Sequence, residues 1–240
     1  MKHIIYKFTF ILFAIVLFGT DVCAQVTIAP TNLFIDSRSK FGTYLVINGS
    51  NESQEISVDF IFGYSMSNED GVRNVVYDDE EKAAEYSAAN WVRAFPKSFT
   101  LAPGQRQVVR LRVVAPNDIA DGTYWSRIRT TSSPVSTPVE VQSNEAITAR
   151  VGIEIAQVTG LYYKKGDVTT GIDITDMNTK MGDDGVLEVV ADLKRTGNSP
   201  FLGSITANVL DTDGNVVTTS FVSTTIFFDG KYKHEIDLST

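Results

Sequence analysis

Apolar and polar residues alternate one by one through most of this chain of 240 residues. The stretch Val108–Val113 is typical, because its arginines stand between apolar neighbours. Successive side chains of a β-strand point to opposite faces, so a strand with one face on a core and one in solvent needs this period of two. A helix needs a period near 3.6 instead. We therefore predict an all-β fold.

The predicted strands are separated by turns rich in Gly, Pro, Asn and Asp. They are 26–35 with a bend at Pro30, 43–47, 56–62, 91–95, 98–101, 108–113, 121–128, 147–163, 172–174, 186–193, 201–210, 216–228 and 232–238.

Residues 63–90 do not follow the alternation. We interpret 67–71 as a loop, and a second loop is predicted over 132–144. The acidic, alanine-rich stretch 78–90 predicts a short helix. Its run of carboxylates at 78–81 is interpreted as a solvated face, since a calcium loop would need a turn-forming glycine among its ligands. The segment 211–215 is interpreted as a hairpin turn.

The N-terminus has the pattern of a secretory signal peptide. Two lysines, Lys2 and Lys7, precede the apolar run 8–18, and Ala24 fits the small residue before a cleavage point. The run is shorter than the ~20 residues that a membrane span needs, and we predict no span elsewhere. A lipid anchor on Cys23 is the alternative, although the residues before it do not match the lipid-attachment pattern well. The mature chain is predicted to be periplasmic or secreted.

The composition argues against several functions. The net charge of −8 argues against nucleic acid and anionic membranes as partners. After removal of residues 1–24 the chain has no cysteine and a single histidine, His234. Thiol nucleophiles and multi-histidine metal sites are thereby excluded, and no Gly-x-Ser-x-Gly or phosphate-binding glycine motif occurs. We predict no catalytic residue, no metal and no cofactor.

The break at 164–167 predicts a boundary between two domains, 25–165 and 166–240. The second has five predicted strands, which would leave unpaired sheet edges. Two explanations stay open: the second domain is truncated, which we favour, or something else completes it. Tyr124, two residues after Gly122, is similar to the tyrosine corner of immunoglobulin sandwiches, where the tyrosine hydroxyl bonds back to the preceding loop. An ordinary interface tyrosine is the alternative. The fold class predicted is two immunoglobulin-like β-sandwich domains.

Several segments, taken in order, resemble the PapD-like periplasmic chaperones of bacterial pilus assembly. Residues 91–105 are similar to that family's strand, proline and Leu-x-Pro-Gly turn. The strands 108–113 and 121–128 follow in the same order, and 147–163 is similar to its long last strand, closing with Leu-Tyr-Tyr-Lys. The resemblance covers about residues 26–165.

The resemblance implies a function. In that family the last strand fills a gap in a pilus subunit that lacks one strand, which is a form of β-augmentation. The matching row of side chains here is Ile147, Ala149, Val151 and Ile153. The alternation also fits the other interpretation, in which this face packs only on the protein's own core.

The family holds the subunit's terminal carboxylate with an Arg in the first strand and a Lys in the last. Those positions fall at Asn32 and near Gly160, and neither is basic. Arg150 or Lys164 could replace them as the carboxylate anchor.

The leading hypothesis is a periplasmic chaperone-like protein whose partners are pilus or other surface-fibre subunits. The alternative is a structural or adhesive envelope protein that uses immunoglobulin-like domains as spacers. An enzyme would have to rely on acidic residues or His234.

Overall fold

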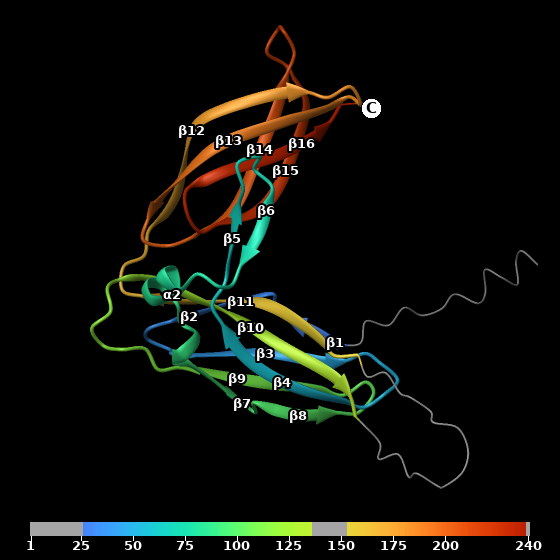
Figure 1. The fold of residues 1–240 in the computed structure, drawn as a ribbon, viewed down its shortest axis with the longest axis vertical. Coiled ribbons are helices and arrows are strands. Elements are labelled where there is room, and N and C mark those ends of the chain that lie inside the picture. Colours follow the sequence, from blue (N-terminus) through green and yellow to red (C-terminus); the bar gives the residue numbers. More distant parts are fainter. Residues whose placement is uncertain (1–25, 136–152, 239–240) are drawn as a thin grey trace, which may run out of the picture.

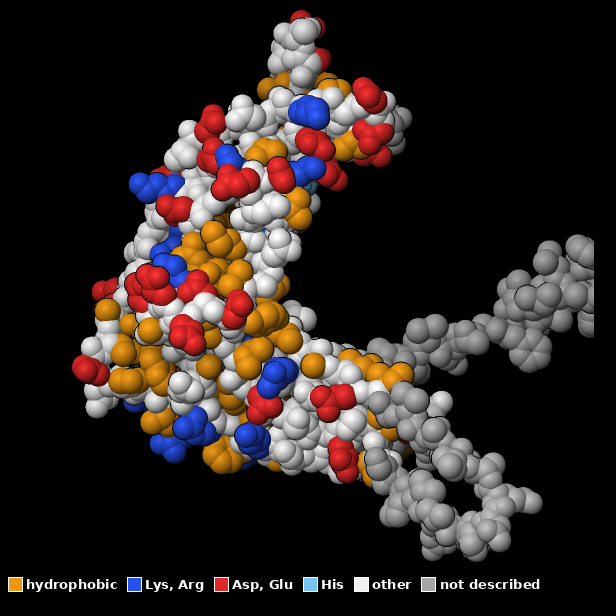
Figure 2. Space-filling model, viewed as in Figure 1, with side chains coloured by type: hydrophobic (Ala, Val, Ile, Leu, Met, Phe, Trp, Pro, Cys, Tyr) orange, Lys and Arg blue, Asp and Glu red, His pale blue; other side chains and the backbone are white. Residues whose placement is uncertain are grey.

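The computed structural model describes residues 26–135 and 153–238. Figure 1 shows two β-sandwiches, one above the other, joined where β11 (Ile155–Lys165) leads into β12 (Thr170–Met181). Figure 2 shows that together they form a C-shaped body, hollowed on one side. The predicted fold class, all-β with two sandwiches, is confirmed.

The N-terminal sandwich consists of two sheets. The first has the order β1 (Val26–Ala29), β3 (Phe41–Asn48), β9 (Arg106–Val113) and β7 (Val92–Phe95). The second has the order β2 (Asn32–Asp36), β11, β10 (Gly122–Pro134), β4 (Gln54–Ile61) and β8 (Ser98–Leu101).

The core between these sheets is made by alternate residues of the strands. In β9, Val109, Leu111 and Val113 are almost completely buried, whereas the arginines between them are exposed. The same inward row in β11 includes Leu161 and Tyr163. The period of two in the sequence therefore marks the core-facing residues, as predicted.

The first predicted strand is corrected by the structure. Instead of one strand bent at Pro30, β1 pairs with β3 in one sheet, while β2 runs parallel to β11 in the other. Proline has no N–H to donate to a ladder, so the break between the two pairings falls at this residue.

A hairpin and a helix occupy the region that lacks alternation. The hairpin consists of β5 (Tyr64–Ser67) and β6 (Arg73–Val76), and the helices are α2 (Glu80–Tyr86) and the short η1 (Ala89–Trp91). The short helix is confirmed. The hairpin was not predicted from the sequence, and the predicted loop over 67–71 forms most of its turn.

The C-terminal sandwich has a three-stranded sheet of β12, β13 (Val186–Gly197) and β16 (Gly230–Asp237). Its second sheet contains β14 (Phe201–Leu210) and β15 (Val216–Ile226). The predicted turn between them is confirmed, because the Asp211 carboxylate accepts hydrogen bonds from the Asp213 and Asn215 amides. The Asn215 side-chain amide donates to the same carboxylate at 3.0 Å, and this bond together with those from the backbone amides holds the pKa of Asp211 below its usual value.

The link between the sandwiches is held by hydrogen bonds. The Asn198 side-chain amide donates to the backbone oxygens of Asp121 and Asp167, at 3.1 and 2.9 Å. Gly166 has a φ of +61°, which favours glycine, and a Cβ added there would lie about 2 Å from the Asp121 carboxylate and would have to displace it. The predicted boundary at 165/166 coincides with the end of β11. The division into two domains at this point remains a prediction.

The tyrosine corner is confirmed, since the Tyr124 hydroxyl donates to the Ala120 carbonyl at 3.1 Å.

Replacing Tyr124 by Phe removes this one hydrogen bond and leaves the aromatic ring unchanged. We expect a loss of about 1 kcal/mol in the free energy of unfolding, measured by urea denaturation. Tyr77→Phe is the control, because the Tyr77 side chain is exposed. Equal losses in both variants would show that the corner contributes nothing specific.

Candidate functional site

An aromatic cluster joins the two sandwiches. Its buried members from the N-terminal sandwich are Phe62, Tyr64, Trp125 and Tyr162, and Phe227 enters from the C-terminal sandwich. The Phe227 ring centroid lies 5.0 Å from that of Trp125, and only 1% of Phe227 is exposed. Burial of this size fixes the position of the C-terminal sandwich on the N-terminal one.

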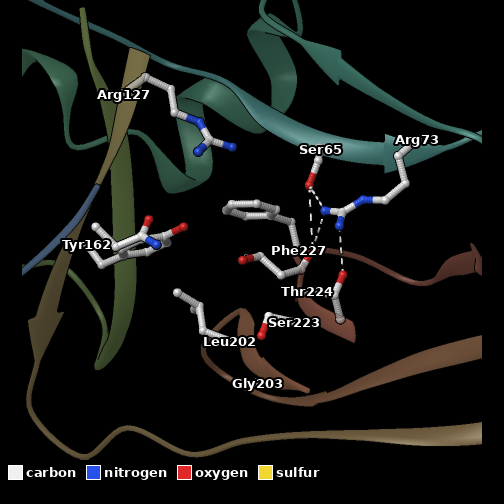
Figure 3. Close-up of a pocket in the computed structure, with 11 residues that line it drawn as sticks. Ser65, Arg73, Arg127, Tyr162, Leu202, Gly203, Ser223, Thr224 and Phe227 are labelled. Atoms are coloured by element: carbon white, nitrogen blue, oxygen red, sulfur yellow. Dashed lines mark hydrogen bonds between the residues drawn. The ribbon is translucent and has the colours of Figure 1, made fainter. Parts of the chain in front are cut away.

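Beside the cluster lies a pocket of about 370 Å³ between the two sandwiches. Figure 3 shows its wall, to which both sandwiches contribute. It is lined by Asn32, Ser65, Arg73, Arg127, Tyr162, Leu202, Gly203, Ser223, Thr224, Thr225 and Phe227. Apart from two arginines, all of these side chains are neutral.

Arg127 comes from β10. Its Nε donates to the Gly63 carbonyl at 3.0 Å, and its guanidinium lies 5.3 Å from the centre of the Phe227 ring. The backbone bond and the ring fix the direction of the guanidinium. Its two terminal nitrogens form no hydrogen bond with any residue in the described part of the chain, so they are available to an anion.

Arg127, Gly160 and Asn32 lie side by side on three neighbouring strands. Gly160 is the cross-strand partner of Arg127 on one side and of Asn32 on the other. Asn32 and Gly160 are the positions where the family resemblance places its two basic residues. Of these three residues only Arg127, on β10, carries a positive charge. A Cβ at Gly160 would approach the Asn32 side-chain oxygen to 2.4 Å, so a larger residue cannot enter without displacing Asn32.

Arg73 reaches the same pocket from β6. Its Nη1 donates to the Thr224 hydroxyl at 2.7 Å, and its Nη2 donates to the Thr225 carbonyl at 2.9 Å and to the Ser65 hydroxyl. In Figure 3 the guanidinium groups of Arg73 and Arg127 point into the pocket from different sides. The ion pairs within the described residues are all formed by other side chains.

The pKa of the Tyr162 hydroxyl, which lines the pocket, depends on burial and on the charges of the pocket. Burial raises this pKa, while Arg127, a hydrogen bond with Thr225, and Arg73 act in the opposite direction. Both arginine charges are thus felt at one point. Two cations without a carboxylate partner, in a pocket with an otherwise neutral wall, favour an anionic ligand.

A second feature is the open edge of β11. Residues 155–165 all pair with β10 on one side. On the other side β2 pairs only with 160–164. Within the described residues, the backbone groups of 155–159 on that side therefore have no strand partner. An unpaired edge of this kind can accept another strand.

The predicted site residues are distributed as follows. Ile147, Ala149, Val151 and Arg150 lie outside the described residues. Ile153 is described, two residues before the start of β11, and 60% of it is exposed. Lys164 is exposed, with its Nζ 5.2 Å from the centre of the Phe34 ring, and it does not line the pocket. The cations that do line it, Arg73 and Arg127, were not singled out from the sequence.

The described residues also bear on three other expectations, which concern the histidine His234, a metal site and a membrane span. His234 Nε2 lies 2.7 Å from the Ser220 hydroxyl, which gives that histidine a polar partner. Within 26–135 and 153–238, no group of three His, Cys, Asp or Glu side chains is placed to hold a metal ion. The same residues include no helix with the length and apolar character of a membrane span.

No family model and no curated protein matches the sequence. The structure is similar to those of chaperones of pilus assembly. A chain from the CsuC–CsuE chaperone–tip subunit complex of Acinetobacter baumannii is 12% identical with a TM-score of 0.46, the match covering 90% of this chain and 89% of that one. The E. coli chaperone DraB is 12% identical with a TM-score of 0.43, covering 89% and 98%.

A further match is the Salmonella enterica complex of the SafA pilin with the SafB chaperone, at 12% identity and a TM-score of 0.44, covering 92% and 99%. This likeness is to the same class of protein that the sequence resembles. At such low identity it concerns the arrangement of strands, and what this chain binds has to be argued from its own residues.

Proposed function

We propose that this protein is a periplasmic chaperone-like protein that binds strand-deficient subunits of surface fibres. The observation that carries the proposal is the open edge of β11 at 155–159. A subunit strand that pairs there would gain main-chain hydrogen bonds. The predicted row Ile147, Ala149, Val151 and Ile153 would supply apolar side chains to the subunit's groove.

The pocket between the sandwiches supports the same function. It adjoins β11 through Tyr162, and its two arginines, which form no ion pair with the described residues, favour an anion. The terminal carboxylate of a subunit is an anion that a guanidinium can bind with two parallel hydrogen bonds. We propose Arg127 as the residue that receives it, in place of the sequence-based candidates Arg150 and Lys164.

The alternative is a structural envelope protein in which the sandwiches act as spacers. The hydrogen-bonded link around Asn198 favours it, because a spacer needs a fixed angle between its modules. A spacer does not need a pocket lined by two cations, so the chaperone-like function explains more of the structure.

Val151→Asp tests the strand-donation proposal, because a charge in the donated row would abolish pairing with a subunit groove. We expect the tagged full-length protein, purified from the envelope fraction of its source, to retain a stoichiometric small β-rich protein identified by mass spectrometry. The Val151→Asp variant is expected to lose that protein while keeping its melting temperature.

Ile174→Asp is the control, since Ile174 is an exposed apolar residue on β12, away from β11. It is expected to retain the partner. Recovery of the wild type alone, or only within surface fibres, would contradict the chaperone-like function and favour the spacer. Unfolding of Val151→Asp would show that the row belongs to the protein's own core.

A further inference from the structure

The β5–β6 hairpin belongs to the N-terminal sandwich but lies along the C-terminal one (Figure 1). Within the described residues β5 and β6 pair only with each other. The turn between them is closed by the Asn68 side-chain oxygen, which accepts from the amides of Asp70 and Val72 at 3.1 and 2.8 Å. The turn therefore has a defined shape with which to contact the other sandwich.

The tip of the hairpin sits on β16. The Lys233 amide donates to the Gly71 carbonyl at 3.3 Å, while Lys233 pairs with Val190 of β13 on its other side. Gly71 has a φ of +76°, and a Cβ there would lie 2.6 Å from the Lys233 nitrogen. Glycine is thus required both by the turn and by the close approach. The hairpin covers part of an edge that β16 would otherwise expose.

The hairpin is also fastened by Arg73, the first residue of β6 after the turn. This one guanidinium bonds Ser65 on its own hairpin and both Thr224 and Thr225 on β15. Thr224 is 6% exposed, so the bond to its hydroxyl is shielded from water. Arg73 and Arg127 therefore differ: the first is bonded across the two sandwiches, whereas the terminal nitrogens of the second have no bond of this kind in the described part of the chain.

We infer that Arg73 is a positioning residue: it holds the β5–β6 hairpin on the C-terminal sandwich and so fixes the pocket wall opposite Arg127. The first half of this inference concerns the protein alone. The second half, the effect on the pocket, rests on the proposed function.

Amide hydrogen exchange of the full-length protein tests the first half. Thr224→Val keeps the shape of the side chain and removes one of the three acceptors of Arg73, a hydroxyl that also bonds Tyr232. We expect exchange at Lys233, which reports the contact with Gly71, to become at least tenfold faster in Arg73→Met and Thr224→Val. Arg73→Lys is expected to restore part of the protection, because it keeps a donor without the fork.

Thr206→Val is the matched control, an exposed Thr→Val change on β14 of the same sheet. It is expected to leave exchange at Lys233 unchanged. Unchanged exchange in both Arg73→Met and Thr224→Val, or equal acceleration in Thr206→Val, would overturn the role of the hairpin.

Acetate, the simplest carboxylate, tests the second half through the Arg127 Nε–H NMR signal. We expect this signal to shift with acetate in the wild type, and at least fivefold more acetate to be needed in Thr224→Val, which loosens Arg73 but keeps both positive charges. Equal acetate dependence in the two proteins would refute the link from Arg73 to the pocket. No shift in the wild type would instead refute the anion pocket of the proposed function, while the result at Lys233 would still decide the role of the hairpin.

Discussion

Replacing Phe227 by Ala is expected to lower the free energy of unfolding by about 3 to 5 kcal/mol, the cost typical of a buried phenylalanine. Phe227 is 1% exposed and contacts rings of both Trp125 and Tyr162, at centroid distances of 5.0 and 6.3 Å. Its removal leaves a cavity between two sandwiches that the rings hold in place. Guanidinium denaturation followed by tryptophan fluorescence measures the loss, because Trp125 lines that cavity.

Phe221→Ala provides the matched comparison. Phe221 lies in β15, six residues before Phe227, but 65% of it is exposed. Its truncation removes little buried area, so we expect a change within about 0.5 kcal/mol. Similar losses in the two variants would mean that the aromatic cluster does not hold the sandwiches together.

Arg127→Met is expected to weaken binding of the captured subunit by roughly 30- to 1,000-fold, which corresponds to about 2 to 4 kcal/mol for the loss of a charged partner at an interface. Methionine keeps an apolar stem against Phe227 and removes the charge. Isothermal calorimetry with the purified subunit measures the effect. A subunit with an amidated C-terminus is expected to bind the wild type as weakly as the free-acid form binds Arg127→Met.

Arg129→Ala controls for the removal of a cation from the same strand. Arg129 stands two residues further along β10, where its guanidinium lies 3.6 Å from the Asp59 carboxylate, outside the pocket. Its loss is expected to change subunit affinity less than twofold. If Arg127→Met and Arg129→Ala weaken binding equally, the arginines act only through general charge and the pocket is not an anion site.

The sequence predicted most of the sheets because their signal is local. Each strand of the N-terminal core alternates over several residues, and β14 was predicted with the bounds that the structure has, Phe201–Leu210. The hairpin escaped prediction because β5 and β6 have only four residues each. Alternation over four residues does not stand out from chance, and the hairpin derives its order from contacts with the other sandwich.

The candidate site was less accessible from the sequence. The last residues of the predicted strand 216–228 illustrate this: β15 ends at Ile226, and Phe227 and Phe228 turn into the aromatic cluster. Apolar residues that follow a strand are indistinguishable from its continuation. The sequence around Arg127 offered one signal, because this charged residue stands in a predicted strand between Ser126 and Ile128, both of which the structure shows to be buried. Only the register of β10 against β11 shows that it faces the pocket.

The aromatic cluster also has a consequence for how the chain acquires its fold. Trp125 and Phe227 are separated by about a hundred residues, and a contact of such range forms late, after local strand pairs. Until Phe227 packs against them, the aromatic rings of the N-terminal sandwich remain exposed to solvent. A fragment cut at the predicted boundary, 25–165, would carry this exposed aromatic surface permanently and is expected to self-associate. The predicted domain boundary is therefore also the interface at which the C-terminal sandwich covers the aromatic surface of the N-terminal one and keeps it from aggregating.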